Sequence, residues 1–305
     1  MDIFEEKSAS PMLIAKMEKP FDASDWIYEL KLDGERCLAY LDQEGTYLQN
    51  KRKLSLNPRF PELINIHQNI GCRCILDGEL AVLVKGKPDF SKVQRRSLMS
   101  NKMKIDIYSE RYPAVFTAFD ILYYEDHLVT ELPLMERKTL LQKAVLQENN
   151  RFAVSRSVER QGTALYEAAK KEDLEGVVAK RRDSYYYMGK RTKDWIKFKN
   201  LMDDDYVILG YKRKENGRAS LILGQYENGT MKECAHVPVS IRQNDFKIIS
   251  SQPVKSQEAG TVWIQPSLVC AVKFMAKAAG GGLRQPVYKG LRDDKEPKEC
   301  IASPS

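Results

Sequence analysis

The chain has 305 residues and a formal net charge of +7, with 43% hydrophobic and 30% charged residues. This composition indicates a globular protein with sizeable cores, and the length predicts two domains. Because no apolar run could span a bilayer and no signal peptide is recognisable, we expect a cytoplasmic protein without a membrane partner. The six cysteines form no C-x-x-C pair and only three histidines are present, which excludes the usual zinc frameworks. The modest basic excess suits a polyanionic partner without identifying one.

After a polar start, residues 28–36 alternate between apolar and charged side chains, as in a half-buried strand. The residues expected to face the core are Tyr28, Leu30 and Leu32. On the polar face Lys31 would lie between Glu29 and Asp33, with Arg36 just beyond a glycine. A lysine held in this way could attack phosphorus as a nucleophile. An exposed edge strand with an ordinary ion pair explains the stretch alone equally well, because short motifs often match by chance.

A hairpin and a basic cluster come next. Residues 37–41 and 46–49 predict its two strands, joined by a turn. The cluster at 50–53 contains Lys51 and Arg52. Such a cluster is usually a solvated charge run, but beside a nucleotide it could hold phosphates or sugar hydroxyls.

Residues 61–69 predict a short helix, and residues 74–84 predict a strand with two different faces. The apolar face would carry Leu76, Leu80 and Val82, and the other face Ile75, Asp77 and Glu79. Acids in the middle of a strand, between apolar neighbours, are more typical of a ligand or cation site than of a surface.

Two helices flank the next strand. Residues 90–104 predict a basic helix, which is either a solvated face or a surface for phosphate contacts. Residues 114–123 predict a buried strand in which Phe116 belongs to the core and Phe119, on the opposite face, could stack on a base. The helix that begins near Pro133 is expected to expose residues 136–138.

A helix at 163–172 leads to two more strands, 174–180 and 195–199, separated by a loop at 185–193. Glu175 is the acid of the first of these strands. In the second, Trp195, Lys197 and Lys199 share one face. Several strands therefore combine an apolar side with a charged side, which predicts facing sheets around a polar groove filled by a ligand.

The pattern changes near residue 200, which predicts domains at 1–200 and 201–305. Beyond this point the sequence predicts short strands, a turn at 215–217 and a helix at 241–250, as in a small closed barrel of the oligonucleotide-binding type. The predicted strands are 206–211, 220–226, 230–236 and 269–275. A glycine run at 280–282, expected to be flexible, leads to a charged cluster at 291–295.

The whole set of motifs resembles that of the ATP-dependent DNA ligases, and it is most similar to the ligase domain of bacterial end-joining ligases. The resemblance extends in order over nearly the whole chain and rests on residues 31–36, 77–79, 119–122, 175–178, 195–199 and 292–295. It implies an α+β fold with two domains. The first would be a nucleotidyltransferase domain of antiparallel sheets with flanking helices, and the second an OB-fold β-barrel.

The resemblance also implies a reaction in which ATP adenylylates Lys31, AMP passes to a DNA 5′-phosphate, and the neighbouring 3′-hydroxyl then seals the nick. Phe119 and Val178 would sandwich the adenine, Glu29 would read its amino group, and Glu79 would meet the ribose. The nucleotide-binding residues implied are Glu29, Lys31, Arg36, Lys51, Glu79, Phe119, Val178, Lys197, Lys199, Arg292 and Lys295. The implied ligands of a divalent cation, Mg²⁺ or Mn²⁺, are Asp33, Glu79 and Glu175.

Nicked duplex DNA is the implied partner, and the protein is expected to be a monomer associated with the nucleoid. The DNA contacts implied are Arg52, Gln94, Arg96, Lys190 and Arg191. The chain departs from the family where Ser-Arg-Asn is usual and residues 50–52 read Asn-Lys-Arg. Either Lys51 or Arg52 could therefore take the role of the arginine in that family motif. The same choice is open between Lys190 and Arg191 in the later loop. DNA would be encircled by surface loops or with help from a partner such as Ku or another repair protein.

Two other classes of protein compete with this interpretation. An RNA ligase or a GTP-dependent RNA capping enzyme would share the lysine motif and the barrel. A non-catalytic nucleic-acid-binding protein could keep a dead nucleotide pocket, but it would then be expected to lack one of the motif residues. The forms of residues 119–122 and 195–199, with the helix that begins at Phe90, favour a DNA ligase.

Overall fold

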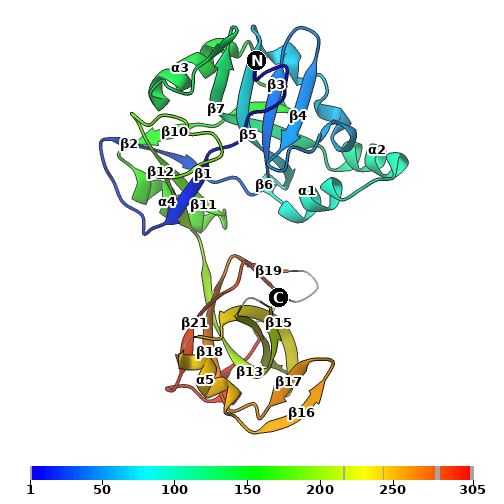
Figure 1. Cartoon of the computed structure of the whole chain (residues 1–305), viewed down its shortest axis with the longest axis vertical. Coiled ribbons are helices and arrows are strands. Elements are labelled where there is room, and N and C mark those ends of the chain that lie inside the picture. Colours follow the sequence, from blue (N-terminus) through cyan, green and yellow to red (C-terminus); the bar gives the residue numbers. More distant parts are fainter. Residues whose placement is uncertain (1, 216, 243, 279–281, 303–305) are drawn as a thin grey trace. The chain divides into compact units, whose positions relative to one another are not determined.

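The computed structural model describes residues 2–215, 217–242, 244–278 and 282–302. The chain divides into two compact units, Met1–Asn200 and Leu201–Ser305 (Figure 1). Four residues of predicted segments lie outside the described residues, namely Asn216, Gln243, Gly280 and Gly281. Among the described residues, no helix has the length and apolar character needed to cross a membrane.

The first sheet of the first unit has five strands in the order β1-β12-β11-β2-β10. Their bounds are Leu13–Met17 (β1), Arg191–Lys199 (β12), Gly176–Arg181 (β11), Trp26–Leu30 (β2) and Ser157–Glu159 (β10). Helix α4, Gly162–Lys171, packs on one face through Ala169, where Tyr28, Val177 and Phe198 are also buried. Trp195 belongs to a different cluster from Ile196 and Phe198, so the predicted two-faced strand at 195–199 is confirmed.

The second sheet of this unit has seven strands, and its main path runs β4-β3-β5-β7-β8. Their bounds are Thr46–Asn50 (β4), Glu35–Leu41 (β3), Cys74–Val84 (β5), Ala114–Tyr124 (β7) and His127–Leu128 (β8), with Lys87–Pro88 (β6) beside β5 and Phe152–Val154 (β9) beside β7. Leu76, Leu80 and Val82 lie in one buried cluster and Ile75 in another, which confirms the predicted faces of β5. The second of these clusters also contains Trp195 of the five-stranded sheet, so it joins the two sheets.

Helices and short turns connect the strands of this sheet. They are α1 (Phe90–Ser97), α2 (Lys102–Arg111), α3 (Leu134–Ala144) and three 3₁₀ segments at Asn57–Arg59, Pro61–Leu63 and Ile66–Asn69. Those with residues in the core cluster of the sheet are α1, α3 and two of the turns. The helix predicted at 61–69 is therefore two 3₁₀ segments. The helix predicted at 90–104 is two helices, because the Asn101 side chain accepts from the amide of Lys104 and starts α2 afresh, while Asp89 caps α1.

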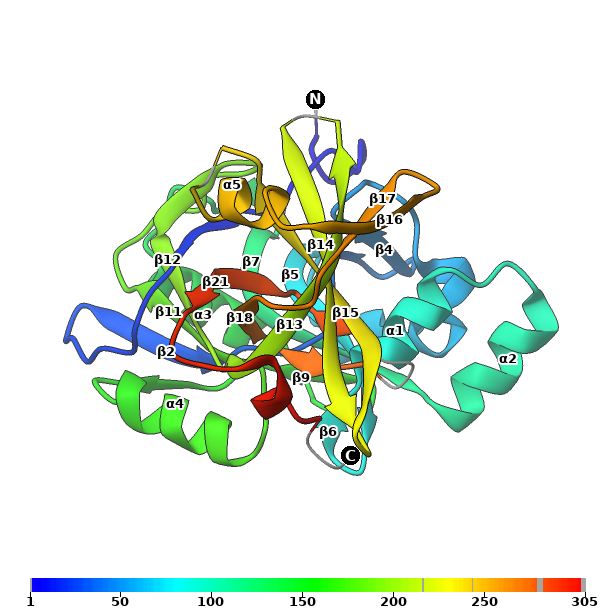
Figure 2. The same cartoon turned by 90° about the horizontal axis from the view of Figure 1, so that it is seen from below.

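The second unit is a small β-barrel. Its strands are β13 (Met202–Lys214), β14 (Arg218–Glu227), β15 (Thr230–Ser240), β16 (Val254–Glu258), β17 (Thr261–Ile264), β18 (Val269–Phe274), β19 (Ala276–Lys277), β20 (Leu283–Arg284) and β21 (Val287–Arg292), with α5 at Asn244–Ser250 and a 3₁₀ turn at Pro297–Glu299. β13 pairs with β14, β17 and β18, and β14 with β15, so these strands run side by side (Figure 2). Phe246 and Ile249 of α5 pack into its core.

The main ladder of this barrel runs β15-β14-β13-β17-β16, and β21 pairs with β18. Within the described part of the chain no ladder joins β15 to β21, so the barrel is partly open, as OB-folds are, rather than fully closed. The four strands predicted here are present, whereas β16, β17 and β21 were missed. Their sequences are short and mix polar with apolar residues, so they give little periodic signal.

Candidate active site

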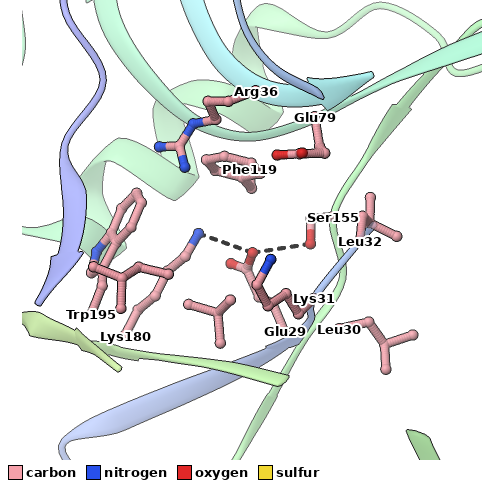
Figure 3. Close-up of a pocket in the computed structure, with 12 residues that line it drawn as sticks. Glu29, Leu30, Lys31, Leu32, Arg36, Glu79, Phe119, Ser155, Lys180 and Trp195 are labelled. Atoms are coloured by element: carbon pink, nitrogen blue, oxygen red, sulfur yellow. Dashed lines mark hydrogen bonds and ion pairs between the residues drawn. The ribbon is translucent and has the colours of Figure 1, made fainter. Parts of the chain in front are cut away.

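A pocket lies in the first unit, where residues of both sheets converge (Figure 3). Its empty volume is about 440 Å³, a figure that includes space open to solvent. The lining residues are Ile14, Glu29, Leu30, Lys31, Leu32, Arg36, Glu79, Phe119, Ser155, Val178, Lys180 and Trp195. Six of the eleven predicted nucleotide-binding residues therefore line one cavity.

Lys31 is the residue that directly follows β2, and it lines the pocket. Its backbone amide donates to the carbonyl of Gly176 at 2.9 Å, and its Nζ donates to Glu175 Oε2 at 2.9 Å. Gly176 has a φ of +138°, and a Cβ there would lie 1.9 Å from the carbonyl oxygen of Phe198, so only glycine fits at this start of β11. The strand predicted to run through Lys31 ends at Leu30. Leu30 is 40% exposed, so the prediction that it faces the core is wrong.

The Glu175 carboxylate pairs with Lys31 and also with a second lysine. Its Oε1 lies 3.1 Å from Lys199 Nζ, and its side chain is only 4% exposed. Lys197 is nearby on β12, where burial, followed by the charges of Lys199 and Lys31, lowers its pKa. The region around Lys31 therefore concentrates positive charge, which suits the binding of a phosphate.

Arg36 and Glu79 form the opposite side of the pocket (Figure 3). The Arg36 guanidinium donates to both oxygens of the buried Asp77, each at 2.5 Å, and lies 4.5 Å from the ring centroid of Phe119. Tyr186 also donates to Asp77, at 2.6 Å. Burial raises the pKa of Glu79 to about 7, against the lowering effect of the Lys31 and Arg36 charges. Near neutral pH this carboxyl group can both donate and accept hydrogen bonds.

Glu29 is 2% exposed and lies beside two ammonium groups. Its Oε2 accepts from Lys180 Nζ and from the Ser155 hydroxyl, both at 3.0 Å, and its Oε1 forms an ion pair with Lys138. Although burial opposes its charge, these two lysines hold the pKa of Glu29 below its usual range. Burial lowers the pKa of Lys180 to about 8, with Glu29 opposing this shift and Lys138 adding to it.

Two charged residues of α3 are buried, although the sequence predicted that they would be exposed. Residues 137 and 138 were expected on the exposed side, but Arg137 is fully buried and Lys138 is 9% exposed. Arg137 pairs with Asp120 at 2.9 Å, next to Phe119. The signal was present, because residues 134, 137, 138 and 141 share one helical face and two of them are leucines. Lys138, Lys180 and Ser155 were all missed as site residues.

The predicted DNA contacts differ in their exposure. Arg52, Gln94, Lys190 and Arg191 have exposed side chains, as has Lys51, which was predicted to bind the nucleotide but is not among the residues that line the pocket. Arg96 is the exception, because its guanidinium is 0% exposed, pairs with Glu62 at 2.7 Å and donates to the carbonyl of Arg59. A side chain enclosed in this way cannot reach a DNA phosphate, so the prediction for Arg96 is wrong.

Three other predicted site residues are not among those that line the pocket. Asp33 follows Lys31 in the loop before β3. Arg292 and Lys295 belong to the second unit, where both pair with Asp205, at 3.3 and 2.8 Å. Asp294 also pairs with Arg292, at 2.7 Å.

Two family models account for most of the chain. The ATP dependent DNA ligase domain matches residues 9–199, and the ATP dependent DNA ligase C terminal region matches residues 214–295. The chain belongs to the ATP-dependent DNA ligases. This ligase is 31% identical over 284 residues to the SPbeta prophage-derived DNA ligase-like protein LigB of Bacillus subtilis, an alignment that covers 93% of this chain and 98% of that protein.

It is also 27% identical to the multifunctional non-homologous end joining DNA repair protein LigD of Mycobacterium tuberculosis strain H37Rv. That alignment covers 98% of this chain but only 40% of LigD. Among solved structures, a mycobacterial DNA ligase D complexed with ATP and MES matches with a TM-score of 0.57 and 26% identity, covering 97% of this chain and 98% of that one. The ligase family, the α+β class and the OB-like second domain predicted from the sequence are confirmed.

Proposed function

We propose that this ligase seals nicks with a 5′-phosphate and a 3′-hydroxyl in duplex DNA, and that Lys31 is its nucleophile. The observation that carries the proposal is the Lys31 ammonium, which reaches Glu175 beside a pocket lined by Glu29, Phe119 and Glu79. Lys31 Nζ attacks the α-phosphorus of ATP, so that a P–N bond forms and the P–O bond to pyrophosphate breaks. The 5′-phosphate of the nick then takes AMP from Lys31, and the 3′-hydroxyl displaces AMP.

The lysine must lose a proton before it attacks. With an ordinary lysine pKa near 10.4, only about one in a thousand is neutral at pH 7.4, a penalty of roughly 4 kcal/mol. Glu175 Oε2 already accepts a hydrogen bond from Lys31 Nζ, so this carboxylate is in position to take the proton. The nearby charges of Lys197 and Lys199 would stabilise the charge that develops on the α-phosphate.

The base and the sugar would occupy the rest of the pocket. Phe119 and Val178 both line it and can sandwich an adenine ring. Glu29 is an acceptor for the adenine amino group, and Glu79 can bind a ribose hydroxyl. Arg36, held by Asp77, would bind the sugar and later the nick phosphate.

We propose that a divalent cation binds this site together with the nucleotide. The described residues contain no group of three or more His, Cys, Asp or Glu side chains arranged to hold a metal ion. Mg²⁺ is usually bound by one or two carboxylates together with substrate phosphates, and Glu175 and Glu79 suit that arrangement. Asp33 is the third proposed ligand. When bound, Mg²⁺ or Mn²⁺ would neutralise charge on the phosphates.

The outer surface would hold the DNA. The exposed Arg52, Gln94, Lys190 and Arg191 can contact its phosphates, which fix position rather than sequence, while Lys51 keeps its proposed contact with the nucleotide. Arg292 and Lys295 of the OB-like unit would orient the leaving pyrophosphate. We also propose that the ligase is a monomer in the nucleoid that acts in DNA repair or end joining, with Ku or another repair protein as a partner. Nick sealing and end joining with and without Ku would test that partner.

Incubation with ATP labelled at its α-phosphate tests the central role. The wild type should form a labelled adduct that passes to nicked DNA, and Lys31→Ala should form none. Lys143→Ala, on the exposed side of α3, should behave as the wild type. An adduct that persists in Lys31→Ala would remove Lys31 from the mechanism. Labelling from GTP in place of ATP would favour a capping enzyme, sealing of nicked RNA alone would favour an RNA ligase, and no adduct at all would favour a non-catalytic binding protein.

A further inference from the structure

We infer that Lys138 is a positioning residue that holds Glu29 as an ionised hydrogen-bond acceptor and thereby makes the pocket select a purine with an amino group at C6. The inference rests on the proposed adenylylation of Lys31. Lys138 comes from α3, the helix that packs beside β7, and its side chain is 11% exposed. An interior lysine at this place needs an explanation, because lysine is almost never fully buried unless it is paired.

Both oxygens of Glu29 have partners on other parts of the chain. Oε2 already accepts from Lys180 and Ser155, and Figure 3 shows both interactions beside Lys31. Oε1 is in close contact with Lys138 Nζ, and the two atoms form an ion pair. Glu29 lines the pocket, and a carboxylate has about four acceptor sites, so these three partners leave one site for a donor on the ligand.

The charge state of Glu29 decides which base it accepts. An ionised carboxylate only accepts hydrogen bonds, whereas a protonated one also donates. The amino group at C6 of adenine donates to such an acceptor. The carbonyl oxygen at C6 of guanine would instead face it with like partial charge. A purine with only hydrogen at C6 offers no donor and leaves the acceptor unpaired.

Lys138 is the cation available to hold this acceptor. A carboxylate as buried as Glu29 would tend to take up a proton unless cations compensate its charge. Lys180 shares its charge with two rings, because its Nζ lies 4.3 Å from the centroids of both Phe119 and Trp195. Arg137, next to Lys138, is committed to Asp120. Lys138 therefore contacts the carboxylate that would bind the base.

The test compares ATP with purine riboside 5′-triphosphate, which lacks the amino group. For each nucleotide, the rate of adduct formation on Lys31 is measured against concentration in the full chain. The wild type should favour ATP by roughly ten- to a hundred-fold, the effect of one hydrogen bond to a charged group. Lys138→Met should lose most of this preference by raising the KM for ATP, while the reaction with purine riboside triphosphate changes little.

Two variants separate this role from a structural one. Lys138→Arg should keep the preference for ATP, and Lys138→Gln should lose it even if the methionine variant folds poorly. Lys143→Met, the same change on the exposed side of α3, should match the wild type. An unchanged preference in Lys138→Gln, or an equal loss with both nucleotides, would overturn the inference. Absence of any adduct in the wild type would instead count against the proposed function.

Discussion

Replacing Arg137 with methionine would remove the cation from an ion pair whose two side chains are both 0% exposed. Arg137 donates to the two oxygens of Asp120, each at 2.9 Å, and to the carbonyls of Leu132 and Ser184, at 2.6 and 2.8 Å. The substitution leaves the Asp120 charge buried with one backbone donor, the amide of Ile121. Breaking a buried pair in this way costs about 3 to 5 kcal/mol.

That loss is a large part of the stability of a typical domain, about 5 to 15 kcal/mol. For a unit of this size it corresponds to a fall in melting temperature of about 6 to 20 °C. Denaturant unfolding followed by tryptophan fluorescence measures it. Arg156→Met is the control, because Arg156 is 75% exposed in its pair with Glu148 and should contribute less than about 1 kcal/mol. The double variant Arg137→Met with Asp120→Asn should be more stable than Arg137→Met alone. Equal effects of Arg137→Met and Arg156→Met would refute the reasoning.

Three further predictions concern the pocket and the DNA surface. Tyr186→Phe removes the hydroxyl that donates to Asp77, so it should reduce the free energy of unfolding by about 1 to 3 kcal/mol. It should also slow nick sealing. Denaturation curves that match those of the wild type would contradict this prediction. The raised pKa of Glu79 means that the folded chain keeps a proton that the unfolded chain has lost, so between about pH 4.5 and 7 the free energy of unfolding should fall as pH rises. Glu79→Gln should reduce this dependence on pH. If the free energies of unfolding of the two proteins change in parallel with pH, the prediction is wrong. Arg52→Ala should weaken DNA binding and reduce the dependence of its affinity on salt by about one phosphate contact. Arg96→Met should instead destabilise the fold and leave the salt dependence of DNA binding unchanged. DNA-binding titrations at several salt concentrations measure both.

Local patterns predicted much of this site. The alternation in β5 and β12 identified the faces that carry Glu79, Lys197 and Lys199, because a strand repeats every two residues whatever its neighbours are. The same reasoning failed at Leu30, where the strand ends one residue before Lys31. It also failed at Arg96, because a basic helix is usually solvated and the sequence does not show that Glu62 lies against it.

The ordered motifs alone determined the family, the two-domain organisation of the prediction and the lysine proposed as nucleophile, because each motif is short and contiguous. Only the tertiary structure decided which buried charges meet. Lys180 reaches Glu29 across 151 positions, Tyr186 reaches Asp77 across 109, and Arg36 reaches Asp77 across 41. These pairs are fixed by the register of strands far apart in the chain and by the packing of α3, so no local sequence pattern predicts them. Burial strengthens the electrostatic interaction within each pair.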